Sequence, residues 1–180
     1  MGTFVSGFVA IVGRPNVGKS TLLNTIIGQK VTIVSDKPQT TRNRIQGVWT
    51  TDEAQVVFLD TPGLHRPQDL LGEAMVKAAT EAVEEVDAVL FLVDGAAGPG
   101  RGDRIVAGML AEVTTPVLLV VNKLDAVPQA ERAAAVEAFR ELGSFASVHA
   151  VSALTGEGVP ELCRAIVSHL PPGPKYYPDD

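Results

Sequence analysis

Short apolar runs alternate with amphipathic stretches along most of this chain. Buried strands read as near-continuous runs of Val, Ile, Leu and Phe, whereas helices repeat apolar residues every three to four positions. On these criteria, strands are predicted at 8–12, 45–50, 55–59, 88–93, 117–121 and 148–151. Helices are predicted at 20–27, 70–86, 103–113, 128–142 and 159–170.

This alternation predicts an α/β fold with a mixed, mostly parallel sheet and helices on both faces. The strands at 45–50 and 55–59 flank the polar turn Asp52-Glu53, so they form a hairpin with one antiparallel strand. Two polar stretches, 29–44 and 60–69, lack any clear periodicity. Irregular loops of such length in a compact domain are usually functional.

Composition indicates one ordered domain. The 180 residues are 46% hydrophobic, and we place the domain at 1–171. The Pro- and Gly-rich segment 172–180 is predicted to be a linker or tail, which suggests a chain cut from something longer. The net charge of −6 argues against a large nucleic-acid footprint, although a phosphate site needs only a few local donors.

Cellular location follows from what the sequence lacks. The single cysteine rules out an internal disulfide, and no signal peptide is visible. No uninterrupted apolar run reaches the length of a membrane span, so a cytoplasmic protein is expected. Peripheral membrane association has no signal in the sequence.

The stretch between the first strand and the first helix matches the phosphate-binding loop, Gly-x-x-x-x-Gly-Lys-Ser. Its residues are Gly13, Arg14, Pro15, Asn16, Val17, Gly18, Lys19 and Ser20, followed by Thr21. A Gly-rich turn leading into a helix aims backbone N–H groups and the positive end of the helix dipole at one point. Lys19 is therefore expected at the outer phosphates of a nucleotide, and the Ser20 hydroxyl at Mg²⁺.

Further polar motifs follow directly after predicted strands, where ligands of parallel sheets bind. Asp60 ends the strand at 55–59 and is expected to hold Mg²⁺ directly or through water. Thr61, Pro62 and Gly63 complete this motif, and Gly63 would let the backbone donate an N–H to the terminal phosphate.

Two motifs after the last strands point to a guanine base. Asp125 in Asn122-Lys123-Leu124-Asp125 can accept from N1–H and the exocyclic amine of guanine, a donor pair that adenine lacks. Asn122 can bridge loops and reach the base, and the stem of Lys123 can cover its face. Ser152, Ala153 and Leu154 are placed to offer a backbone N–H to the base carbonyl.

In this order and approximate spacing, the four motifs resemble those of translation-factor-class P-loop GTPases. The segments 13–24, 38–42 and 60–65 narrow the resemblance to the bacterial Era-type GTPases, over essentially the whole chain. The resemblance implies a three-layer P-loop NTPase fold with a six-stranded sheet and hydrolysis of GTP to GDP and phosphate. It also implies a role in small ribosomal subunit assembly. The KH domain that binds ribosomal RNA in that family is absent here, which makes RNA binding by this chain alone doubtful.

The same resemblance assigns switch residues. Thr40 or Thr41 would ligate Mg²⁺ when the γ-phosphate is present, and we favour Thr41. Leu64 stands where signalling GTPases carry a water-orienting glutamine, so slow intrinsic hydrolysis is expected. Asn16 resembles an asparagine that coordinates K⁺ in related GTPases, although a plain turn residue is an equal alternative. Lys19, Thr41, Gly63 and Asn16 are thus the catalytic candidates.

Three other functions stay open. The chain could act as a GTP/GDP-binding switch module with negligible turnover, which Leu64 favours. It could be an ATP-dependent phosphotransferase, which the segment 122–125 argues against. It could also be a tRNA-modification or double-G-domain GTPase, which the motifs alone do not separate from an Era-type protein.

Overall fold

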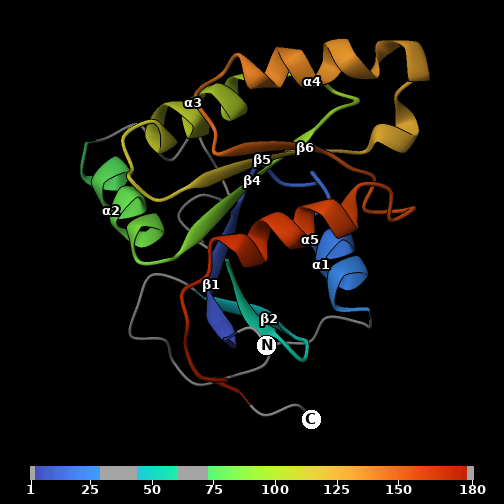
Figure 1. Ribbon diagram of the computed structural model, residues 1–180. Coiled ribbons are helices and arrows are strands. Elements are labelled where there is room, and N and C mark those ends of the chain that lie inside the picture. Colours follow the sequence, from blue (N-terminus) through green and yellow to red (C-terminus); the bar gives the residue numbers. More distant parts are fainter. Residues whose placement is uncertain (1–2, 29–43, 61–72, 178–180) are drawn as a thin grey trace.

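The computed structural model describes residues 3–28, 44–60 and 73–177. Within these ranges the chain forms six strands and five α-helices (Figure 1). The strands are β1 (Val5–Val12), β2 (Arg44–Thr50), β3 (Ala54–Asp60), β4 (Ala88–Asp94), β5 (Val117–Asn122) and β6 (Ser147–Ala150). The helices are α1 (Lys19–Ile27), α2 (Glu73–Glu84), α3 (Arg101–Leu110), α4 (Arg132–Arg140) and α5 (Val159–Ser168).

All six strands belong to one sheet in the order β2-β3-β1-β4-β5-β6. Every neighbouring pair is parallel except β2 and β3, which form the predicted hairpin. The pairing of β1 with both β3 and β4 marks the point where the strand order reverses. In open α/β sheets ligands bind at such a point, outside the carboxyl ends of the strands. The predicted fold class is therefore confirmed.

Two apolar cores lie on opposite faces of the sheet. Helices α2, α3 and α4 cover one face, and α1 and α5 cover the other (Figure 1). Successive residues of a central strand alternate between them: Ala10 and Val12 of β1 join the first core, whereas Val9 and Ile11 join the second. Burial on both faces explains why these strands read as unbroken apolar runs.

Helix boundaries differ from the predicted ones by a few residues. The helix expected at 103–113 spans Arg101–Leu110. The Asp103 carboxylate accepts the N–H of Gly100 and so stabilises this earlier start, as the acidic residue of a capping box does. The helix expected at 128–142 opens with a 3₁₀ turn, Gln129–Glu131, before α4. Among the described residues, no helix is long and apolar enough to cross a membrane.

The C-terminal segment 171–177, predicted to belong mostly to a linker, lies against the sheet. Pro172 forms an isolated antiparallel bridge with Val5 at the start of β1. Tyr177 packs against the core on the α2–α4 face. The domain boundary at 171 stays a prediction.

Helix α4 offers a test of how the cores hold the fold. Phe139 is the one residue of α4 whose side chain is buried, and it is fully enclosed. We expect Phe139→Ala to lower the free energy of unfolding by about 3–5 kcal/mol, measured by urea denaturation. Glu137→Ala, an exposed change on the same helix, should stay within about 0.5 kcal/mol of the parent. Equal effects of the two variants would contradict the assigned packing.

Candidate nucleotide site

The loop between β1 and α1 is shaped by two glycines. Gly18 has φ of +101°, a left-handed conformation that favours glycine, and a Cβ there would collide with the side chain of Asn122. A Cβ on Gly13 would collide with the carbonyl oxygen of Leu92. The loop can therefore follow this path only without side chains at these two positions.

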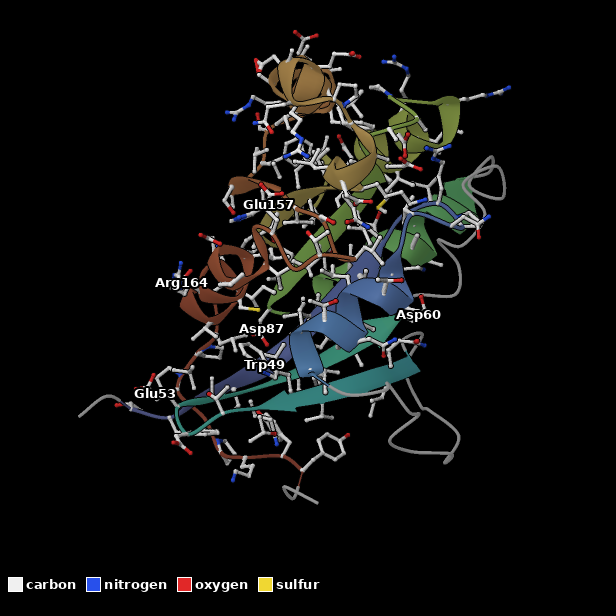
Figure 2. The ribbon with its side chains drawn as sticks, turned by 90° about the vertical axis from the view of Figure 1, so that its right-hand side faces the viewer. Trp49, Glu53, Asp60, Asp87, Glu157 and Arg164 are labelled. Atoms are coloured by element: carbon white, nitrogen blue, oxygen red, sulfur yellow. The ribbon has the colours of Figure 1, made fainter. Side chains whose placement is uncertain are left out.

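A cavity of about 310 Å³ lies beside this loop. Lys19, Ser20 and Asp60 line it, together with Pro15 and Gln46. The Lys19 Nζ is 3.4 Å from the Asp60 Oδ1, so the start of α1 and the end of β3 meet here. Figure 2 shows Asp60 at the edge of the sheet beside α1. The structure thus brings together the predicted phosphate and Mg²⁺ residues that it describes.

Sequence reasoning missed Gln46 as a lining residue. The register between β2 and β3 shifts between Ile45 and Gly47, which leaves Gln46 as the extra residue of a bulge. A bulge turns a side chain away from the regular alternation of a strand. No signal in the sequence marks this shift.

The donor groups of the cavity suit a nucleotide phosphate and Mg²⁺. Mg²⁺ prefers a hydroxyl and one carboxylate alongside phosphate oxygens and waters, rather than an all-protein cage. Ser20 and Asp60 offer such a hydroxyl and carboxylate, and Lys19 offers an ammonium to phosphate oxygens. Among the described residues there is no cluster of three or more His, Cys, Asp or Glu side chains that could hold a metal ion.

The side chain of Asn122 connects this loop to the second half of the site. Asn122 is 2% exposed; its Nδ2 donates to the carbonyl of Val17 at 2.9 Å, and its Oδ1 accepts the N–H of Ala153 at 2.9 Å. The expected bridging role is therefore present in the structure. Because both ends of the amide are engaged, Asn122 acts as a brace behind the loops.

The segment 152–154 offers one backbone donor. The N–H of Ala153 is bonded to Asn122, and that of Ser152 donates to the carbonyl of Glu157 at 2.9 Å. Within the described part of the chain, the N–H of Leu154 has no hydrogen-bond partner, and the residue is 75% exposed. Of the three amides expected to reach a base carbonyl, Leu154 therefore supplies the available one.

Asp125 is positioned by a neighbouring hydroxyl. The Ser152 Oγ donates to the Asp125 Oδ1 at 2.7 Å, which orients the carboxylate. The Thr25 Oγ1 of α1 donates to the carbonyl of Ala153 at 2.6 Å and so ties the segment 152–154 to α1. Thr25 was missed by sequence reasoning, because a single hydroxyl on a helix has no distinguishing pattern.

Lys123 spans the mouth of the site. Its Nζ donates to the carbonyl of Asn16 at 2.7 Å and lies 3.1 Å from the Asp94 Oδ2. Asn16 and Lys123 both have a left-handed backbone, with φ of 69° and 68°. Asp94 was not predicted as a site residue, although its place at the end of β4 obeys the same strand-end rule as Asp60.

Residues 8–123 match a protein-family model described as "50S ribosome-binding GTPase". The chain belongs to this family. It is also similar to curated relatives named GTPase Era. It is 53% identical to that of Leuconostoc citreum (strain KM20) and 51% identical to that of Alkaliphilus metalliredigens (strain QYMF), over 99% of this chain. The chain covers 59% and 60% of the length of these relatives.

Solved structures of Era share this fold. One is Era in complex with MgGDPNP and nucleotides 1506–1542 of 16S ribosomal RNA, at 39% identity and a TM-score of 0.77. Another is a tyrosine-to-alanine variant of Aquifex aeolicus Era bound to GDP.AlF4⁻, at 39% identity and a TM-score of 0.75. Each match covers 98% of this chain and 61% of the other. The resemblance to Era-type GTPases is thus confirmed.

The side chain of Arg14, in the phosphate-binding loop of this GTPase-family chain, points to α3. Its Nε donates to the Asp103 Oδ1 at 3.0 Å, and Asp103 is fully buried. The other oxygen of Asp103 accepts the N–H of Gly100 at 2.8 Å. The Arg14 side chain therefore ties the loop to the first turn of α3.

Several predicted site residues lie outside the described part of the chain. They are Thr40, Thr41, Thr61, Pro62, Gly63 and Leu64. Thr21 lies in α1 and is exposed. The assignments of these residues stay predictions.

Loss of the Asn122 brace gives a direct test of the site's construction. Asn122→Ala leaves the Val17 carbonyl and the Ala153 N–H without their partner, so we expect a loss of about 1–3 kcal/mol in the free energy of unfolding. The measurement is urea denaturation without nucleotide. Leu154→Ala, an exposed change beside the same site, serves as control. An Asn122→Ala protein as stable as this control would argue against the brace.

Proposed function

We propose that this domain binds Mg²⁺·GTP and hydrolyses it to GDP and phosphate. The observation that carries the proposal is a series of hydrogen bonds that connects the phosphate-binding loop to the carboxylate of Asp125. Asn122 ties Val17 to Ala153, and the adjacent Ser152 holds Asp125. The similarity to Era bound to MgGDPNP supports the same assignment.

Guanine selection falls to Asp125 and the segment 152–154. Asp125 is exposed to solvent, and each carboxylate oxygen has more than one acceptor position, so the bond from Ser152 leaves room for a ligand. The N1–H and exocyclic amine of guanine donate to this carboxylate, and the N–H of Leu154 donates to the base carbonyl. Adenine carries an acceptor at N1 and no amine at C2, so it would leave Asp125 unpaired.

Phosphate binding falls to the loop and the cavity beside it. Lys19 offsets negative charge on the outer phosphates, and the backbone N–H groups of the loop 13–20, which Pro15 lacks, surround them. Ser20, Asp60 and Thr41 hold Mg²⁺, which neutralises charge that develops on the phosphates. The backbone N–H of Gly63 binds the terminal phosphate, and water is the nucleophile. Positioning and electrostatics thus supply the catalysis.

Slow intrinsic turnover follows from Leu64. Its side chain has no polar atom, so it cannot orient the attacking water as glutamine does in signalling GTPases. We propose that Asn16 would hold K⁺, which would supply positive charge near the phosphates. The left-handed backbone at Asn16 also suits a turn residue without a ligand, and a cation-dependence assay separates these two roles.

The biological role we propose is that of a nucleotide switch in small ribosomal subunit assembly. The similarity to an Era that binds 16S ribosomal RNA supports this role. Binding of ribosomal RNA and of the small subunit is part of this proposal. The chain covers about three fifths of the length of its curated relatives. A cytoplasmic location is part of the same proposal.

A second candidate is a binding module with negligible turnover, which the apolar Leu64 favours. Single-turnover release of phosphate, measured with and without small ribosomal subunits, separates the two functions. Release within the assay in either condition supports the enzyme. No release in both supports the binding module.

Base selection can be inverted by one substitution. Asp125→Asn replaces an acceptor with a donor, and xanthine presents a carbonyl where guanine presents its amine. We expect GTP affinity to fall at least about a hundredfold and XTP to become the preferred ligand. The amide of the variant would face the amine of guanine, and two donors that the bound base covers together stay unpaired. Isothermal titration of the parent and of Asp125→Asn with GTP, ATP and XTP measures these affinities. A parent that binds ATP as tightly as GTP would overturn the proposed function.

The cation proposal has its own measurement. Hydrolysis in K⁺ buffer should exceed that in Na⁺ buffer of equal ionic strength, because a cation near the phosphates offsets charge in the transition state. Asn16→Ala should abolish the difference while GTP stays bound. Equal rates of the parent in both buffers would leave Asn16 as a turn residue.

A further inference from the structure

Gln55 is a fully buried polar residue in the otherwise apolar interior of β3. A buried amide without partners is costly, so its hydrogen bonds show what it serves. Its Oε1 accepts the backbone N–H of Tyr176 at 2.7 Å and that of Tyr177 at 3.1 Å. Its Nε2 donates to the carbonyl of Tyr177 at 2.8 Å and to the Thr50 Oγ1 at 2.9 Å.

Three of these four bonds go to main-chain atoms of one short segment. One amide side chain thus bonds to main-chain atoms of two successive residues, Tyr176 and Tyr177, much as a neighbouring strand would. Main-chain bonds of this kind supply affinity for an extended peptide, and side-chain pockets add specificity. Gln55 is therefore placed to bind the main chain of an extended segment.

We call the segment 171–177 the strap. Its first residues run alongside the start of β1. The N–H of Ser6 donates to the carbonyl of Pro171 at 3.1 Å, and the N–H of Gly173 donates to the carbonyl of Phe4 at 3.2 Å. The ring of Tyr176 lies 5.2 Å from that of Phe8. Figure 1 shows the strap leaving α5 and passing beside β1.

One contact under the strap opposes docking. The Ser6 Oγ is buried and has no hydrogen-bond partner among the described residues. Gly173 lies over it, and a Cβ on Gly173 would come 2.7 Å from this oxygen. A buried hydroxyl without a partner favours the state in which water reaches it. The strap is thus held by Gln55 and disfavoured by Ser6.

We infer that Gln55, Thr50, Phe8 and the start of β1 form a peptide-binding site whose ligand is this chain's own strap, docked reversibly. The site lies at the end of β3 opposite Asp60. Figure 2 shows Glu53 and Asp60 at the two ends of this strand. When docked, the strap sets where the backbone lies after α5, at the opposite end of β3 from Asp60. This inference goes beyond the proposed function and needs no bound nucleotide.

The test is hydrogen exchange of the Tyr176 and Tyr177 backbone amides, followed by NMR on the full chain. Gln55→Met keeps the length and burial of the side chain but removes its polar atoms. We expect both amides to exchange at least about tenfold faster, because they lose their buried acceptor. Ser6→Ala removes the unpaired hydroxyl, so the same amides should exchange about threefold or more slower.

Controls separate docking from general stability. Amides in the centre of β4 should exchange as in the parent in both variants. Gly173→Ala supplies a change outside the core, and its added methyl group should speed exchange at Tyr176 and Tyr177. Unchanged exchange in both Gln55→Met and Gly173→Ala would overturn the inference. So would faster exchange in Ser6→Ala.

Discussion

The site depends on one buried amide. Asn122 donates to the phosphate loop and accepts from the segment after β6, so it fixes two loops that are 136 positions apart at Val17 and Ala153. Its burial makes this an obligatory contact, because neither loop's polar atoms can turn to water instead. Gly18 leaves the space that the Asn122 side chain occupies. The Asn122 side chain can therefore take this position only because residue 18 is glycine.

Other hydrogen bonds also connect the phosphate-binding loop and α1 to neighbouring parts of the site. The Lys123 Nζ, from the segment 122–125, donates to the carbonyl of Asn16, and the Thr25 Oγ1 of α1 donates to the carbonyl of Ala153. Arg14 ties the loop to α3 through the buried Asp103. Together these bonds hold the phosphate loop from several sides, which is the preorganisation that the proposed GTP hydrolysis requires. The sheet beneath supplies the rigid frame, with its carboxyl ends on one edge.

Sequence pattern predicted the strands and helices because burial on both faces of a parallel sheet leaves unbroken apolar runs. It also predicted that Lys19, Ser20 and Asp60 would meet, since the strand-end rule follows from the topology alone. The Arg14–Asp103 pair, the Thr25 bond and the Gln46 bulge depend on tertiary approach that no local pattern records. Gln55 is similar: its strand was predicted, but its partners lie about 120 residues away.

The central claim is that Asn122 joins a phosphate site and a guanine site into one nucleotide site. The most direct measurement is an NMR titration of the chain with GDP and Mg²⁺ that follows the amides of Gly18, Lys19, Asp125 and Leu154. The account predicts that all four signals shift together, with a single dissociation constant. Shifts confined to Gly18 and Lys19, or separate constants for the two pairs, would contradict it.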